Sequence, residues 1–164
     1  MNSIYLVGFM GSGKTSIALR LESLLGLPVE DTDQMIEAYY KQDIPTIFQI
    51  NGEETFREYE TNILKQTSKV NTIVATGGGI IEKEVNRAWL RQNGTVFFLH
   101  TSWEETERRL INDKSRPIWN NQARDKQKLL EERLPKYEEV ADYIIHTDGK
   151  DVEEIAAEIV SLLK

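Results

Sequence analysis

The segment that most constrains this chain runs from Gly8 to Thr15 and matches the phosphate-loop pattern G-x-x-x-x-G-K-S/T. Glycines in this pattern let backbone N–H groups turn inward around a phosphate, where a Cβ atom would obstruct them. Lys14 adds a charge beside the β- and γ-phosphates, and Thr15 offers a hydroxyl to Mg²⁺. The segment therefore predicts an ATP site. The residues expected to bind ATP here are Gly11, Ser12, Gly13, Lys14, Thr15 and Ser16.

The alternative is a glycine-rich turn that matches the pattern by coincidence. A true phosphate loop lies between a strand and a helix, and the helix directs its positive end at the bound anion. Residues 4–7 form a short apolar run typical of a buried strand. Residues 14–25 carry apolar side chains at helical spacing and end before Gly26, a favourable helix stop. This context favours the phosphate loop.

Strand-like and helix-like segments alternate along the whole chain. Short apolar, β-branched runs predict strands at 4–7, 27–29, 72–76, 95–100 and 143–145. Amphipathic segments predict helices at 14–25, 34–40, 44–67, 82–92, 125–141 and 152–163. We expect breaks near Pro45 and Gly52, a kink at Pro135, and a capping box formed by Ser102 and Glu105. The alternation predicts the α/β class, with a parallel sheet covered by helices on both faces.

Length and composition narrow the classes of protein further. The 164 residues favour one domain spanning 1–164. A net charge of −7 argues against nucleic acid as the main partner, because phosphate backbones attract basic surfaces. The absence of cysteine excludes disulfides and a cysteine nucleophile. We see no signal peptide and no run long enough to span a membrane, so we expect a cytoplasmic protein that binds no membrane. We separately expect a monomer.

Two carboxylates, Asp31 and Asp33, follow the second predicted strand. Alternate residues of a strand point the same way, so both would face one site. One could hold Mg²⁺ and the other could orient or deprotonate an acceptor hydroxyl. The alternative is helix capping, since an aspartate before residues 34–36 is a good N-cap. With a phosphate loop in the same chain, function is favoured for at least one of the pair.

Three groups of residues are expected to meet at one edge of the sheet. The phosphate loop, the Asp31/Asp33 pair and Gly77-Gly78-Gly79 each follow a predicted strand directly. In open α/β sheets ligands bind at the carboxyl ends of the strands. The three groups therefore predict one composite site.

Taken together, the motifs of this chain resemble those of shikimate kinase. The matching motifs are, in order, the phosphate loop, Asp31-Thr32-Asp33, Gly52-Glu53-x-x-Phe56-Arg57-x-x-Glu60, Gly77-Gly78-Gly79, Arg116-Pro117 and Arg133-x-Pro135-x-Tyr137. The resemblance implies a P-loop kinase fold, three-layer α/β/α, with a five-stranded parallel sheet in the order 2-3-1-4-5. It also implies transfer of the ATP γ-phosphoryl group to the 3-hydroxyl of shikimate, with Mg²⁺ as cofactor.

The resemblance implies a role for each matching residue. Those that would contact shikimate are Asp33, Arg57, Gly78, Gly79 and Arg133, and the acceptor-binding region would be about 31–60. Lys14 and Arg116 would hold the transferring phosphoryl group, which makes them catalytic together with Asp33. Thr15 and Asp31 would belong to the Mg²⁺ site. Arg109 would lie against adenine.

The chemistry of shikimate is consistent with these residue types. Its carboxylate needs fork-shaped donors, which Arg57 and Arg133 can each supply. Its hydroxyls need a carboxylate acceptor and open backbone N–H groups, which Asp33 and Gly78-Gly79 could provide. Taken singly, each residue has a plainer interpretation. Arg57 could be a solvated i,i+3 partner of Glu60, Arg133 could pair with its acidic neighbours, and the glycines could form a tight turn.

A basic segment of about 112–128 would form a lid over ATP and exclude water, with a solvated loop as the alternative. Trp119 stands where the family has an aliphatic residue. His100 and His146 are more typical of structural or solvated histidines than of a site.

Two other functions remain open from the sequence. A different small-molecule P-loop kinase, such as a gluconate kinase, would share the phosphate loop. A nucleotide-binding module without catalysis would retain ATP binding. Proteins that have lost catalysis usually lack at least one catalytic residue, whereas here Lys14, Asp33 and Arg116 are all present.

Replacing Arg116 tests the lid. Charge develops on the transferring phosphoryl group, and a fixed guanidinium stabilises that charge. We therefore expect Arg116→Ala to lower kcat far more than it weakens ATP binding, measured by steady-state kinetics and nucleotide titration. An unchanged kcat would remove Arg116 from the chemistry.

Overall fold

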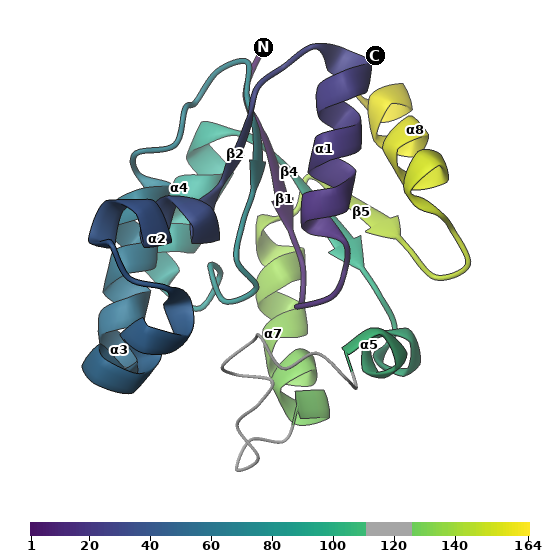
Figure 1. The fold of residues 1–164 in the computed structure, drawn as a ribbon. Coiled ribbons are helices and arrows are strands. Elements are labelled where there is room, and N and C mark those ends of the chain that lie inside the picture. Colours follow the sequence, from purple (N-terminus) through teal and green to yellow (C-terminus); the bar gives the residue numbers. More distant parts are fainter. Residues whose placement is uncertain (111–125) are drawn as a thin grey trace.

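A five-stranded sheet forms the centre of the protein in a computed structural model that describes residues 1–110 and 126–164. Neighbouring strands pair in parallel in the order β2-β3-β1-β4-β5 (Figure 1). The strands are β1 (Ile4–Val7), β2 (Val29–Asp31), β3 (Ile73–Ala75), β4 (Thr95–His100) and β5 (Tyr143–His146). The predicted fold class and strand order are confirmed.

The helices follow the predicted segments closely. They are α1 (Lys14–Leu25), α2 (Thr32–Tyr40), α3 (Ile44–Leu64), α4 (Glu84–Asn93), α5 (Trp103–Leu110), α7 (Lys126–Val140) and α8 (Val152–Leu162). The break at Gly52 is confirmed, since its φ of 87° and ψ of 166° are non-helical. The expected break at Pro45 is wrong, because proline fits the first turn of a helix, where its missing N–H has no partner to lose.

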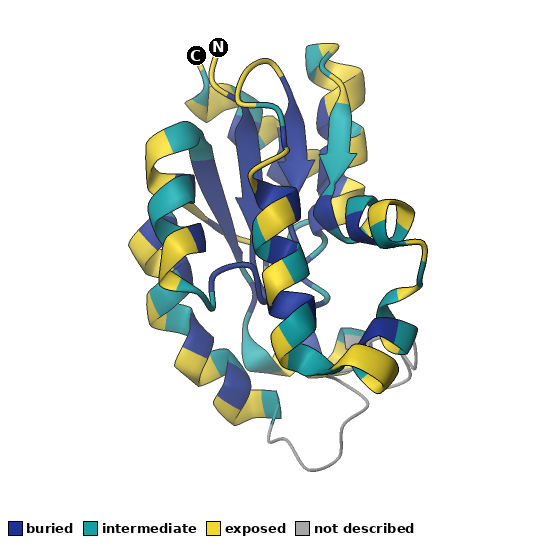
Figure 2. Ribbon diagram, turned by 90° about the vertical axis from the view of Figure 1, so that its left-hand side faces the viewer, coloured by how far each residue is buried: buried dark blue, intermediate teal, exposed yellow. Residues whose placement is uncertain are grey.

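The two faces of the sheet bury different side chains, because residues of a strand alternate between faces. Ile4 and Leu6 of β1 lie in a core with residues of α1 and α8, whereas Tyr5 and Val7 lie in a second core with residues of α4 and α7. Figure 2 shows strands buried in the middle and helices exposed along their outer sides. The three-layer arrangement follows from this alternation.

Helices α2 and α3 share a smaller core of their own. Ile36 of α2 packs with Ile47, Phe56 and Ile63 of α3, and each of these side chains is at most 4 % exposed. This core holds the two helices together beside the β2 edge of the sheet (Figure 1). It therefore gives the predicted acceptor-binding region of about 31–60 a rigid base. None of the described helices is long and apolar enough to cross a membrane.

The predicted capping box at α5 is half correct. Ser102 Oγ accepts a hydrogen bond from the N–H of Glu105 at 3.2 Å, as expected of an N-cap. The Ser102 N–H instead donates to Asp148, while the Glu105 carboxylate accepts from Arg108 and Arg109. The guanidinium groups of Arg108 and Arg109 bind the carboxylate that would have completed the box, and Asp148 accepts the bond from the Ser102 N–H. The contact with Asp148 comes from another loop, so the local sequence does not reveal it. A complete capping box forms at α8, between Asp151 and Glu154.

Gly94 provides a test of how tightly the sheet is packed. A Cβ atom at this position would overlap the ring of Tyr5 and lie 3.0 Å from the Ser3 carbonyl oxygen. Because Tyr5 is fully buried, its ring has no room to move away. We expect Gly94→Ala to lower the free energy of unfolding by about 1–3 kcal/mol, measured by urea denaturation.

The matched control is Gln92→Ala, at an exposed position in the last turn of α4, two residues before Gly94. We expect its effect to stay within about 0.5 kcal/mol. Equal stabilities of the two variants would contradict the packing described for Gly94.

Candidate active site

The phosphate loop joins β1 to α1 and needs its glycines. Gly11 and Gly13 have φ values of 79° and 94°, in the left-handed region that L side chains rarely adopt. A Cβ atom at Gly8 would lie 2.8 Å from the carbonyl oxygen of Leu99. The backbone therefore takes a path that other residues would obstruct, directly before the N-terminus of α1. A helix start reached in this way can bind an anion.

Lys14 lies over this loop. Its Nζ donates to the carbonyl oxygens of Gly8 at 2.7 Å and Phe9 at 3.1 Å, and the residue is 9 % exposed. The hydroxyls of Thr15 and Ser16, at exposed positions in the first turn of α1, follow at once. Gly11, Ser12 and Gly13 precede them in the same loop, and Ser12 is buried.

The Asp31 carboxylate accepts hydrogen bonds from two neighbouring residues. Its Oδ1 accepts from the Gln34 N–H at 3.1 Å and caps α2, while its Oδ2 accepts from the Thr15 hydroxyl at 3.3 Å. A carboxylate oxygen beside a hydroxyl oxygen fits Mg²⁺, which keeps several waters and takes few protein ligands. The described residues contain no cluster of three or more metal-ligating side chains, so any metal here would rely on water and phosphate oxygens.

The structure corrects the reason given for pairing Asp31 with Asp33. Asp33 is not an alternate strand residue, because β2 ends at Asp31 and Asp33 lies in the first turn of α2. The capping aspartate is accordingly Asp31 and not Asp33. Asp33 packs against the glycine triplet, since a Cβ atom at Gly77 would lie 2.6 Å from its Oδ1. The Gly77 N–H donates to Thr32 Oγ1 at 3.0 Å and fixes this contact.

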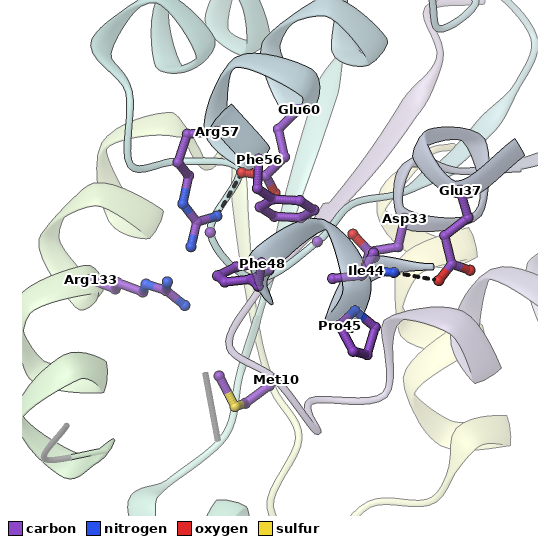
Figure 3. Close-up of a pocket in the computed structure, with 13 residues that line it drawn as sticks. Met10, Asp33, Glu37, Ile44, Pro45, Phe48, Phe56, Arg57, Glu60 and Arg133 are labelled. Atoms are coloured by element: carbon purple, nitrogen blue, oxygen red, sulfur yellow. Dashed lines mark hydrogen bonds and ion pairs between the residues drawn. The ribbon is translucent and has the colours of Figure 1, made fainter. Parts of the chain in front are cut away.

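A cavity of about 340 Å³ opens beside the phosphate loop. All five residues predicted to contact the acceptor line it, and they come from α2, α3, α7 and the loop after β3. Its lining consists of Met10, Asp33, Glu37, Ile44, Pro45, Phe48, Phe56, Arg57, Glu60, Gly77, Gly78, Gly79 and Arg133. In Figure 3 the guanidinium groups of Arg57 and Arg133 reach toward one side of the cavity, and Asp33 and Glu37 lie on the other.

Arg57 is not the solvated surface arginine of the plainer interpretation. It is 8 % exposed, and it donates to Glu60 at 2.6 Å and to Glu53 at 3.2 Å. Glu60 is 1 % exposed, so the i,i+3 pair is real but buried. Burial raises the pKa of the Glu60 carboxyl, and Arg57 opposes that rise. The Arg57 side chain also lies directly over Gly79, where a Cβ atom would overlap the guanidinium.

Arg133 is more deeply buried, at 1 % exposed. Its Nε donates to Glu82 at 2.9 Å, and not to the acidic neighbours considered from the sequence. The guanidinium lies 5.7 Å from the centre of the Phe9 ring. Its Nη2 atom is buried without a hydrogen-bond partner among the described residues. An unsatisfied cationic donor at a cavity wall is suited to binding an anion.

The glycine triplet joins the cavity to the phosphate loop. A Cβ atom at Gly78 would lie 3.4 Å from the Met10 nitrogen and 3.6 Å from the Gly8 oxygen, so the two loops are in contact. The Tyr137 hydroxyl donates to the Gly78 oxygen at 2.6 Å and holds the triplet from the side of α7. Burial raises the pKa of Tyr137 to about 12 and keeps this donor protonated. A phosphate and a small acid would therefore lie side by side.

Several functional residues were not predicted. Glu60 and Tyr137 belong to the motifs, but the sequence assigned neither of them a role in the site. Glu82 lies outside every motif, and only the fold brings it to Arg133. The sequence also did not predict the apolar wall of the cavity, because apolar side chains usually indicate core. This wall is formed by Met10, Ile44, Pro45, Phe48 and Phe56.

Arg109 reaches the phosphate loop, where its Nη1 donates to the Gly11 oxygen at 3.0 Å. Its Nε donates to Glu105 at 2.9 Å, which fixes the side chain from α5. Arg116 and most of the predicted lid, together with Trp119, lie outside the described residues. His100 and His146 face each other across β4 and β5, with Nδ1 atoms 3.3 Å apart.

The two glutamates bound to Arg57 make a matched comparison. Removing the buried Glu60 leaves the buried Arg57 guanidinium with Glu53 as its remaining carboxylate partner among the described residues, whereas an exposed partner such as Glu53 contributes little. We expect Glu60→Ala to lower the free energy of unfolding by about 3 kcal/mol and Glu53→Ala, whose side chain is 40 % exposed, by less than about 1 kcal/mol. Urea denaturation of both variants measures the difference, and equal losses would show that burial does not distinguish the two pairs.

Comparison with known proteins agrees with this geometry. The family model described as shikimate kinase matches residues 10–164. A shikimate kinase of Bacillus cereus is 43% identical over 160 residues, which cover 97% of this chain and 96% of the relative. A solved shikimate kinase from Acinetobacter baumannii, in complex with shikimate, has a TM-score of 0.93 and 38% identity, covering 99% of this chain and 93% of that chain.

A gluconokinase from Sinorhizobium meliloti also has the same fold. It covers 97% of this chain and 89% of that chain, with a TM-score of 0.58 and 18% identity, a likeness that extends to the fold alone. The full-length matches at higher identity are to shikimate kinases, and they agree with the cavity and the phosphate loop described above. The chain thus has the P-loop kinase fold and belongs to the shikimate kinase family.

Proposed function

We propose that this enzyme transfers the γ-phosphoryl group of ATP to the 3-hydroxyl of shikimate, giving shikimate 3-phosphate and ADP in aromatic amino acid biosynthesis. One observation carries the proposal. A cavity lined by two buried arginines and by the carboxylates of Asp33, Glu37 and Glu60 touches the phosphate loop through the glycine triplet. The Acinetobacter baumannii relative, described as a complex with shikimate, supports the same acceptor.

The acceptor is held by charge on one side and by hydrogen bonds on the other. Arg57 and Arg133 bind the carboxylate of shikimate, since two buried guanidiniums offer several charge-assisted hydrogen bonds to one anion. Asp33 accepts a hydrogen bond from an acceptor hydroxyl, and the backbone at Gly78 and Gly79 allows a close approach. Phe48 and Phe56 pack against the ring and exclude water from it.

The donor lies across the phosphate loop. The backbone of Gly11, Ser12 and Gly13 binds the phosphates, with Ser16 at the start of α1. Lys14 and Arg116 hold the transferring group. Arg109, already bonded to the Gly11 oxygen, lies beside the nucleotide and packs on adenine.

Thr15 and Asp31 are the residues that would hold Mg²⁺, with water and phosphate oxygens completing its ligands. When bound, the cation neutralises charge on the phosphates. The protein's own contribution is to keep one carboxylate and one hydroxyl oxygen together at the start of α1. We infer no further metal from the described residues.

The transfer forms one bond and breaks one. The acceptor oxygen attacks the γ-phosphorus as the bond to the β-phosphate oxygen breaks, and ADP leaves with that electron pair. Asp33 orients the attacking hydroxyl and accepts its proton as the new O–P bond forms, and a loose transition state demands little more from a base. Lys14 and Arg116 stabilise the charge on the transferring oxygens.

The enzyme works as a cytoplasmic monomer on small molecules, without nucleic acid or membrane partners.

Turnover of two acids tests the proposal directly. A coupled assay of ADP release with shikimate or gluconate as the acceptor should give turnover with shikimate alone, because the arginine pair and Phe48 and Phe56 suit a compact ring acid. Removing Mg²⁺ with EDTA should abolish turnover. Turnover of gluconate but not shikimate would overturn the proposal, and ATP binding without transfer to either acid would favour a module without catalysis.

A further inference from the structure

Glu82 connects three parts of the acceptor site. Its Oε2 accepts from Arg133 Nε at 2.9 Å, and its Oε1 accepts from Lys136 Nζ at 2.8 Å. Its own N–H donates to the Gly79 carbonyl oxygen at 3.0 Å, at the turn that follows the glycine triplet. Glu82 thus joins the triplet to α7, although Glu82 and Arg133 lie 51 residues apart along the chain.

The position of Glu82 decides which edge of Arg133 faces the cavity. A guanidinium is planar, so a bond to Nε fixes the directions of both Nη atoms. Nη1 lies 3.5 Å from the place of a Cβ atom on Gly78, and Nη2 is buried without a partner among the described residues. With Nε bound to Glu82, the Nη edge faces the glycine triplet, where one donor is shared with the Tyr137 hydroxyl and Nη2 is left for an anion in the cavity.

Lys136 keeps Glu82 from cancelling the charge of Arg133. A carboxylate paired with Arg133 alone would leave the pair neutral, but Lys136 restores one net positive charge. Burial raises the pKa of the Glu82 carboxyl, and Lys136 and Arg133 outweigh this and lower the pKa to about 2. Glu82 is therefore ionised throughout the neutral range, and the three groups together carry one positive charge beside the cavity.

We propose that Glu82 is a positioning residue for acceptor binding, which holds Arg133 by its Nε edge and presents the Nη edge to the carboxylate of the acceptor. The inference rests on the proposed function, because shikimate supplies that carboxylate. Glu82 lies outside the cavity lining and does not touch the acceptor. Its effect is on the affinity for the acid, and it has no part in the ATP site.

Glu82→Gln is the first test, since it retains the size of the side chain and removes its charge. We expect the KM for shikimate to rise on the order of tenfold, with the KM for ATP nearly unchanged and kcat changed less than KM. Glu84→Gln is the matched control, two residues along, because Glu84 is exposed and pairs with Arg87 and Arg91. We expect its KM values to equal those of the wild type.

Lys136→Met is the second test, and its side chain is 37 % exposed, so the variant should fold. Without Lys136, Glu82 offsets the charge of Arg133, and the KM for shikimate should rise again with no change in the KM for ATP. In the double variant with Glu82→Gln, Lys136→Met should raise the KM for shikimate by a smaller factor than it does in the wild type, because both substitutions act through Arg133.

Three results would overturn the inference. The first is a KM for shikimate in Glu82→Gln and Lys136→Met equal to that of Glu84→Gln. The second is an equal rise in the KM values for shikimate and ATP together with a lower melting temperature, which indicates a structural role alone. The third is a wild-type enzyme without turnover of shikimate, which would overturn the proposed function and this inference with it. Wild-type turnover with unchanged variants would overturn the inference only.

Discussion

The parallel pairing of β1 with β3 is the contact on which the site depends. It places Leu6 opposite Ala75, so the phosphate loop and the glycine triplet leave the sheet side by side. The Thr76 N–H and hydroxyl both donate to the Leu6 oxygen and prolong the pairing to the end of the strands. A change of register by one residue would separate the two loops and turn the buried side chains of β3 to the opposite face.

Buried charge shapes the acceptor side of the site. Arg57 and Arg133 are almost fully removed from water, and each is held by a carboxylate from the protein. Removing a guanidinium from water without a partner is costly, so these carboxylates make the burial possible. They also fix the orientation of each arginine before any ligand arrives, which reduces the ordering that binding requires. Glu60, at the cavity wall, and Glu82, outside it, thus hold the arginines proposed to bind the acceptor.

The local pattern of the chain predicted most of the elements and misjudged features that depend on distant neighbours. The helix after Lys14 and the strand at residues 95–100 were predicted with their observed bounds, because apolar periodicity and a glycine stop are local signals. The expected placement of Asp31 and Asp33 as alternate residues of one strand was wrong, since β2 ends at Asp31 and α2 begins directly after it. The capping box at Ser102 lost its second bond to Asp148, a residue far along the chain.

By itself the sequence determined the donor site and the residue types of the acceptor site. A phosphate loop is a continuous segment whose glycines and lysine act on one another locally, so its pattern is sufficient. Only the tertiary structure decided which carboxylate pairs with which arginine. Glu60 pairs with Arg57 through one helix turn, but Glu82 meets Arg133 only because the turn after β3 packs beside α7. Burial is likewise a property of the whole fold, and it distinguishes a buried guanidinium aimed at a cavity from a solvated arginine with the same neighbours in sequence.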